Sequence, residues 1–280
     1  MDIAKLIVDC KNTHGEGIVW CEKRKQVLWT DIEGRFLWMY CPETQVSTSL
    51  EMPDRLCAFM IREDNTLLAG FDSYVAIMAI ETNTVVKQFD FEPNNPFSRL
   101  NDGKSDGNGN FVVGGENESG DCSYNTSVIK IDRDLKVHTL IEDVTCANSI
   151  CFSPDGSTMY YTDTPTSTIF AYDYSPDCVS LPTPKVLFKG EGRFSLPDGS
   201  TVDKEGYIWN AVWGSNAVIR IHPETGSIVR IIDVPAKNPT CVVIGGTNLK
   251  TLFITSSRKG LTDEELNEQP SSGGLYSIDL

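Results

Sequence analysis

Thr158-Met159-Tyr160-Tyr161-Thr162-Asp163 is a short apolar segment that follows a turn sequence, and similar segments recur along the chain. The six segments begin at Val27 (VLWTD), Thr66 (TLLAG), Asn110 (NFVVG), Thr158 (TMYYTD), Tyr207 (YIWNA) and Thr251 (TLFIT). Their starts are 39, 44, 48, 49 and 44 residues apart, which is a nearly even period. Such a period indicates a repeat architecture, in which each repeat is one unit packed against its neighbours.

A second apolar segment with alternating side chains follows the first in several repeats, for example at residues 35–40 and 217–221. Three or four strands in a unit of about 45 residues, repeated six times, are typical of a six-bladed β-propeller. We therefore predict an all-β protein in which residues 1–280 form a single six-bladed β-propeller domain. The alternatives, a large β-sandwich or a pair of small β domains, have no reason to keep so even a period.

The last predicted strand, at residues 274–279, is expected to pair with an early segment of the chain. This pairing would close the ring, because a propeller has to avoid an exposed sheet edge. The only helical-looking stretch, residues 263–268, is expected to lie in a loop.

Charge and composition argue against several kinds of partner. The formal net charge of −15 disfavours binding to nucleic acid or to an anionic membrane surface. The longest nearly continuous apolar run, residues 74–80, is far shorter than the roughly 20 residues of a membrane span. The nine cysteines form no C-x-x-C pair and no signal peptide is evident, so we expect reduced thiols and a cytoplasmic location. A monomer or weak oligomer is expected.

The repeat also predicts which side chains meet at the axis, because the innermost strand of every blade lines the same central channel. Counting back nine to eleven residues from four of the segments reaches Glu16, Asn101, Asn148 and Asp198. Two carboxylates and two amide oxygens form a donor set that suits a hard divalent cation. The alternative is that these residues only bond nearby backbone at turns and strand ends.

Several short motifs along the chain together resemble the SMP-30/gluconolactonase family, which includes regucalcin and bacterial sugar lactonases. In chain order these motifs are Gly15-Glu16-Gly17 with Trp20, Arg99-Leu100-Asn101-Asp102-Gly103, Asn148-Ser149 with Ser153-Pro154-Asp155-Gly156 and Tyr161-Thr162-Asp163-Thr164, and Pro197-Asp198-Gly199 with Asp203-Lys204-Glu205-Gly206 and Trp209. The closing stretches, residues 255–261 and 269–274, resemble bacterial aldonolactonases such as xylonolactonase.

The resemblance implies a propeller with one catalytic divalent metal ion held by Glu16, Asn148 and Asp198, and with Arg99 and Asn101 binding substrate. Calcium, zinc, manganese and iron all occur in the family, and magnesium also suits the oxygen donors. Family members place an acidic substrate contact shortly after the third-blade strand, where this chain reads Gly-Gly-Glu-Asn-Glu at residues 114–118 in place of the usual Gly-Thr-Met. We assign this contact to Glu118, with Glu116 as the alternate.

The expected activity is hydrolysis of a small sugar lactone of the gluconolactone, xylonolactone or arabinonolactone type to its aldonic acid, which makes the protein a carboxylic-ester hydrolase. The metal acts as a Lewis acid and Asp198 as the general base for the attacking water. Arg99 and Asn101 suit the carboxylate and hydroxyl groups of a sugar acid. The alternatives are a non-catalytic calcium-binding, regulatory propeller and a metal-dependent phosphoester or organophosphate hydrolase.

Nucleophilic catalysis is not indicated, because the chain has no Gly-x-Ser-x-Gly motif and its three histidines occupy unrelated repeat positions. His14 lies two residues before Glu16, so contact with substrate at the channel mouth is one interpretation of it. Trp213 is predicted either to pack between blades or to form a wall beside the substrate.

Overall fold

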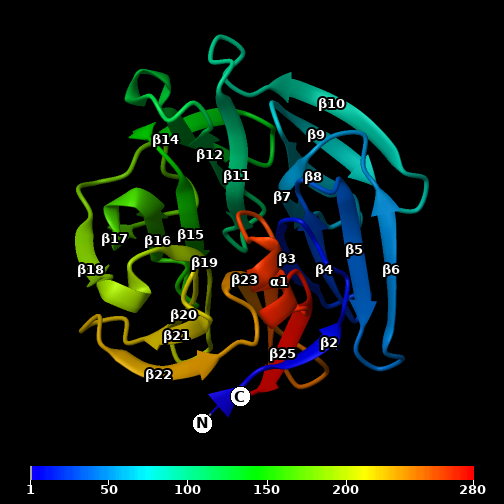
Figure 1. Ribbon diagram of the computed structural model, residues 1–280. Coiled ribbons are helices and arrows are strands. Elements are labelled where there is room, and N and C mark those ends of the chain that lie inside the picture. The colour runs from blue at the N-terminus through cyan, green and yellow to red at the C-terminus, as the bar shows by residue number, and fades with distance from the viewer. Residues whose placement is uncertain (1) are drawn as a thin grey trace.

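The computed structural model describes residues 2–280, whose strands form six sheets arranged as blades around a common axis (Figure 1). Apart from the outermost strands of blades five and six, the strands of each blade pair in chain order from the axis outward. The six-bladed β-propeller and its repeat positions are therefore confirmed. Each of the six recurring apolar segments is the second strand of its blade.

The bounds of the strands follow the repeat. Blades one to three contain β3 (Gly15–Cys21), β4 (Gln26–Asp31), β5 (Phe36–Cys41) and β6 (Val46–Glu51); β7 (Leu56–Ile61), β8 (Leu67–Phe71), β9 (Tyr74–Ala79) and β10 (Thr84–Asp90); and β11 (Ser98–Ser105), β12 (Phe111–Asn117), β13 (Thr126–Ile131) and β14 (Val137–Val144). Blades four to six contain β15 (Ala147–Phe152), β16 (Thr158–Asp163), β17 (Thr168–Asp173) and β18 (Lys185–Lys189); β19 (Pro197–Val202), β20 (Ile208–Val212), β21 (Ala217–Ile221) and β22 (Ile228–Asp233); and β23 (Asn238–Gly245), β24 (Thr251–Ser257) and β25 (Leu275–Asp279).

Strands from the beginning of the chain complete the last two blades. β2 (Lys5–Val8) pairs antiparallel with β25 as the outermost strand of blade six, with Leu6 opposite Tyr276. β1 (Asp2–Ile3) adds to β22 of blade five in parallel. The predicted closure of the ring is confirmed, and Figure 1 shows the blue N-terminal and red C-terminal strands side by side.

Burial decreases from the second strand of a blade to its outer edge. All five residues of β8 and of β20 are buried, because neighbouring blades cover both faces of these strands. The outermost β6 is almost entirely exposed and carries polar side chains. The apolar segments that define the repeat are therefore the layer that packs blade against blade.

Tryptophans contribute to this packing where the indole N–H finds a partner. Trp29 and Trp209 are fully buried, and their Nε1 atoms donate to Asn12 Oδ1 at 2.7 Å and to Asp203 Oδ2 at 3.0 Å. Both tryptophans belong to the inter-blade core.

Helical segments are short and lie in loops. α1 (Asp263–Glu268) begins with a capping box formed by Thr262 and Glu265, and the 3-10 turns are η1 (Cys122–Tyr124), η2 (Thr164–Thr166) and η3 (Gly192–Phe194). No helix within residues 2–280 has the length and apolar character needed to cross a membrane.

Every innermost strand contains a β-bulge, which the sequence patterns did not predict. The pairing with the second strand shifts between Leu56/Ala58, Leu100/Gly103, Pro239/Val242 and, beside the acidic and amide residues of interest, between Glu16/Val19, Asn148/Cys151 and Pro197/Ser200. A bulge adds a residue and redirects the side chains next to it. The same irregularity in six blades therefore gives all of them the same geometry at the axis.

Deletion of residues 2–8 is expected to destabilise the ring, because it removes β2 and leaves the polar edge of β25 unpaired. We expect the free energy of unfolding to fall by about 3 kcal/mol, roughly one for each lost ladder pair. Urea unfolding followed by circular dichroism measures the change. Deletion of residues 2–3 alone is the control, and an equal loss from both deletions would contradict a role of β2 in closure.

Candidate functional site

Four side chains meet at one end of the axis. The six innermost strands run in the same direction along the axis, so residues near their starts reach the same end of the channel. Glu16, Asn101, Asn148 and Asp198 all lie there, each less than a tenth exposed. Asn101 Nδ2 donates to Asn148 Oδ1 at 3.3 Å, which joins blades three and four.

Glu16 and Asp198 influence each other strongly. Burial and the nearby Asp102 carboxylate raise the pKa of Glu16 to about 8. Burial, Glu16 and Asp102 likewise raise the pKa of Asp198 well above its ordinary value. These are the effects of two like charges held close together away from water.

The donor set fits a divalent cation, although it is not rich in acids. Within residues 2–280, no three His, Cys, Asp or Glu side chains gather as a metal-binding group. The axial set instead combines two carboxylates, Glu16 and Asp198, with the Asn148 amide. Buried carboxylates that repel each other need a cation or a shared proton, and oxygen donors of this kind suit a hard divalent ion.

The Asn148 amide is oriented with its oxygen toward Asn101 and the axis. Its Nδ2 donates to Thr164 Oγ1 at 2.9 Å, and Thr164 Oγ1 donates to the carbonyl of Pro197 at 3.0 Å. The second bond links blade four to the residue that precedes Asp198. Asn148 Oδ1 therefore remains the atom that can serve as a metal ligand.

Two equivalent aspartates fix the backbone just before the inner strands of blades one and four. Asp31 accepts hydrogen bonds from the amides of Thr13 at 3.0 Å and His14 at 2.8 Å. Asp163 accepts from the corresponding amides of Thr145 and Cys146 at 3.1 and 2.8 Å. The Thr-Asp ending shared by the segments at 27–31 and 158–163 is the sequence signal for these backbone-binding aspartates. The repeat positions alone do not identify it.

A small polar network holds the backbone of Asp198. Its carbonyl accepts hydrogen bonds from Ser149 Oγ at 3.0 Å and from Asn210 Nδ2 at 2.8 Å. Ser149 directly follows Asn148 and has a φ of 59°, in the left-handed region that glycine favours. This backbone geometry therefore directs the Ser149 hydroxyl at the neighbouring blade.

Blade three forms a polar wall in which Arg99 is fully buried. Its Nη1 donates to Asn101 Oδ1 and to the Leu100 carbonyl, both at 2.8 Å. Nε donates to Glu118 Oε1 at 3.0 Å, and Nη2 pairs with Glu116. Four of the five N–H groups of Arg99 are thus used within the protein, so its main visible effect is to orient Asn101 and the two glutamates.

The two glutamates of this wall differ in their surroundings. Glu118 makes a bidentate pair with Arg55, at 2.8 and 2.9 Å, in addition to its bond from Arg99. Glu116 instead contributes to the raised pKa of Asp198, which places its charge nearer the axial carboxylates. Glu118 therefore accepts hydrogen bonds from two arginines, whereas Glu116 pairs with Arg99 and lies near enough to Asp198 to raise its pKa.

An aromatic pair lies at the same end of the axis. The rings of His14 and Trp213 stack with centroids 5.7 Å apart and planes inclined by 26°. Burial and the positive charges of Lys259 and Arg99 lower the pKa of His14 well below its ordinary value. His14 is therefore a neutral imidazole that lies close enough to Arg99 for the arginine charge to lower its pKa.

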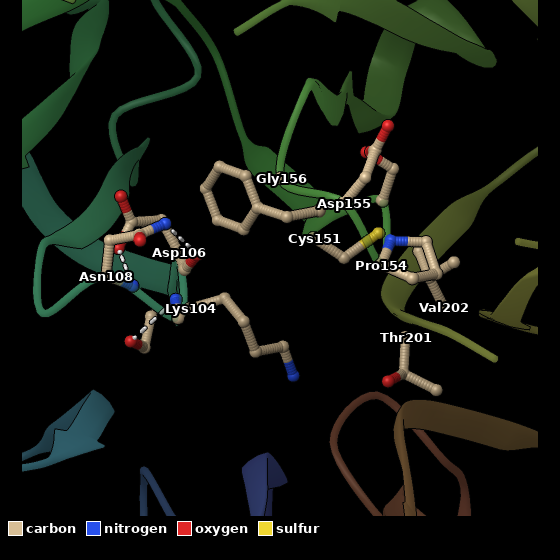
Figure 2. A pocket seen from close by; sticks show the side chains of 13 residues that line it. Lys104, Asp106, Asn108, Cys151, Pro154, Asp155, Gly156, Thr201 and Val202 are labelled. Carbon is tan, nitrogen blue, oxygen red and sulfur yellow. Dashed lines mark hydrogen bonds between the residues drawn. The ribbon is translucent and has the colours of Figure 1, made fainter. Parts of the chain in front are cut away.

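The opposite end of the inner strands opens into a different cavity of about 430 Å³. Figure 2 shows Lys104 extending into this cavity from β11, toward Thr201 of blade five. Burial opposes the charge on Lys104, but Cys241 and Asp102 raise its pKa. Lys104 follows Asn101 by three residues, so it lies farther along the channel than Glu16 and Asp198 and balances part of their charge.

Comparison with known proteins identifies the family. A profile of the SMP-30/gluconolactonase/LRE-like region matches residues 14–258. The chain is 35% identical over 278 residues to an L-arabinolactonase of Azospirillum brasilense, covering 98% of this chain and 90% of that protein. It is 28% identical over 275 residues to a 6-deoxy-6-sulfogluconolactonase of Pseudomonas putida, covering 98% and 93%.

A solved structure agrees with these relatives. The calcium-binding protein regucalcin of Agrobacterium tumefaciens superimposes with a TM-score of 0.92 at 26% identity, covering 99% of this chain and 93% of the other. The chain is thus a β-propeller related to lactonases, which are carboxylic-ester hydrolases. It belongs to the SMP-30/gluconolactonase family.

The raised pKa of Glu16 predicts a pH-dependent stability of the metal-free protein. A carboxyl group that binds its proton more tightly when folded stabilises the fold at low pH, and this contribution is lost as pH rises from 4.5 toward about 8. We expect a decline of about 3–5 kcal/mol over this window. Urea unfolding at a series of pH values measures it.

Glu16→Gln should flatten this decline, since the amide does not titrate, and excess divalent cation should flatten it in the wild type. Thr82→Val, on an exposed turn, is the control and should keep the wild-type profile. A stability that rises across the same window would show that the two carboxylates are not buried together.

Proposed function

We propose that this protein is a metal-dependent sugar lactonase that hydrolyses aldono-lactones to aldonic acids. The observation that carries the proposal is the buried pair of carboxylates, Glu16 and Asp198, beside the Asn148 oxygen that is directed toward Asn101. Membership of the SMP-30/gluconolactonase family and the similarity to an L-arabinolactonase support a lactone as the substrate.

Glu16, Asn148 and Asp198 would hold one divalent cation, which when bound polarises the lactone carbonyl as a Lewis acid. Calcium, zinc, manganese, iron and magnesium are candidates. The similarity to the calcium-binding protein regucalcin supports a divalent ion as the cofactor.

Asp198 acts as the general base. A carboxylate that holds the cation through one oxygen has a second oxygen free to accept a proton from the attacking water. It takes a proton from water as the water oxygen bonds to the lactone carbonyl carbon. The ring C–O bond then breaks, and the protonated Asp198 returns the proton to the leaving hydroxyl oxygen. The bonds from Ser149 and Asn210 keep the Asp198 backbone in place for both transfers.

Blade three binds the sugar. Asn101 and an acidic residue contact the ring hydroxyls, and Arg99 holds both of them in position through its Nη1 and Nη2 groups. We propose Glu116 for the acidic contact in preference to Glu118, because both oxygens of Glu118 already accept hydrogen bonds from Arg55. A carboxylate that faces Asp198 can accept hydrogen bonds from neighbouring hydroxyls of a bound polyol.

Asp198→Asn is expected to keep the fold and to lower kcat at least about 100-fold, because the amide cannot accept the water proton. The assay uses chelator-treated protein in weak buffer with a pH indicator, adding divalent metals singly with five- and six-carbon aldonolactones. Ser47→Ala on the exposed outer strand of blade one is the matched control. A near-normal rate for Asp198→Asn would reassign the base.

The same assay separates the alternatives. Calcium binding without acid release from any lactone would favour a non-catalytic propeller. Turnover of phosphoesters but not lactones would favour the phosphoesterase alternative.

Glu116→Gln is expected to lower kcat/KM roughly tenfold, mainly through KM, since it loses charge-assisted bonds to substrate hydroxyls. Glu118→Gln is the matched variant and should change kcat/KM less than about threefold, because Glu118 is engaged with Arg55. Steady-state kinetics on the best lactone of the panel decides between them. The reverse order of effects would restore Glu118 as the contact.

A further inference from the structure

His14 lies beside the axial carboxylates, yet the proposed mechanism does not use it. It precedes Glu16 by two residues in extended backbone, and alternate residues of such a segment share a face. Its own backbone is fixed on both sides, since its amide donates to Asp31 at 2.8 Å and its carbonyl accepts from the Ile32 amide at 2.9 Å. The imidazole is therefore held on the axial side of the strand.

The ring has no hydrogen-bond partner. Neither nitrogen of the His14 ring makes a hydrogen bond within residues 2–280, and the whole residue is only 9% exposed. Nδ1 is enclosed by the protein, so Nε2 is the ring nitrogen that a ligand can reach. Side chains buried to this extent nearly always have their donors and acceptors paired, and each exception needs an explanation. The unpaired Nε2 is explained if a ligand supplies the missing bond.

The partner ring shows which part of the site this nitrogen serves. Trp213, which stacks on His14, directly follows β20 in blade five, whereas His14 directly precedes β3 in blade one. The stacked pair therefore spans blade six. Blade three, with Asn101 and Glu116, lies across the axis in the ring of six, so a molecule bound over Glu16 has a polar wall on one side and the histidine–tryptophan pair on the other.

An aldonolactone suits both walls, because its hydroxyl groups project from a ring that also presents C–H faces. We propose that His14 Nε2 forms a direct hydrogen bond with one hydroxyl group of the bound sugar lactone, with Trp213 fixing the imidazole plane, and that this bond helps determine which lactone is accepted. The inference rests on the proposed lactonase function. A site built to bond a hydroxyl rejects the analogue that lacks it, because its own polar atom is then left unpaired.

The test compares His14→Leu with His14→Gln on L-arabinono-, D-xylono- and D-gluconolactone and on their monodeoxy analogues. On the preferred lactone, His14→Leu should lower kcat/KM by about tenfold or more, mainly through KM. The loss should vanish on the one deoxy-lactone that lacks the bonded hydroxyl. His14→Gln places an amide near the position of Nε2 and should retain most of the activity. His138→Leu, on outermost β14, is the control and should match the wild type.

Binding of the matching alditol, which has no lactone bond to hydrolyse, is measured in parallel by titration calorimetry. His14→Leu should weaken it by a similar factor. The same loss on parent and all deoxy-lactones, or no loss on any, overturns the role of His14 while the lactonase proposal stands. A wild-type protein that neither hydrolyses a lactone nor binds an alditol overturns both. His14→Phe, which keeps a ring against Trp213 but has no nitrogen, replaces His14→Leu if that variant does not fold.

Discussion

Two acidic side chains buried near one another are the constraint on which this end of the molecule depends. Glu16 and Asp198 make no ion pair within the described chain, and burial raises the pKa of both. A fold would lower its energy by replacing either of them with an apolar side chain. Their presence is therefore a cost, which the proposed divalent cation would offset, and the surrounding structure holds them in place.

That surrounding structure consists mostly of hydrogen bonds to backbone. Asp31 and Asp163 each hold two amides just before an inner strand, and Ser149 and Asn210 hold the Asp198 carbonyl. The Ser149 bond joins blade four to blade five, and the other bonds act within a single blade. The backbone beside the axial residues is thereby held in place. Preorganisation of this kind keeps a constellation in place before substrate arrives.

The repeat made the fold and the positions of the axial residues predictable, because a period in sequence becomes a rotation in space. Glu16, Asn148 and Asp198 share a repeat position, and their convergence follows from that alone. The choice between Glu116 and Glu118 did not follow, because it depends on Arg55, a residue of another blade. Stacking of His14 on Trp213 is likewise not predictable from a periodic pattern, since it joins loops of blades one and five across blade six.

The arrangement around Arg99 bears on how a lactonase would release its product. Hydrolysis turns a neutral lactone into a carboxylate anion, and an arginine with free donors would bind that anion tightly. Here Glu116, Glu118 and Asn101 already occupy Arg99, so its charge is compensated before any product forms. With a formal net charge of −15, the protein as a whole also repels an anion. The same acidic wall that would accept hydrogen bonds from the hydroxyl groups of a neutral sugar would thus disfavour retention of the aldonate. Weaker binding of product than of substrate favours turnover.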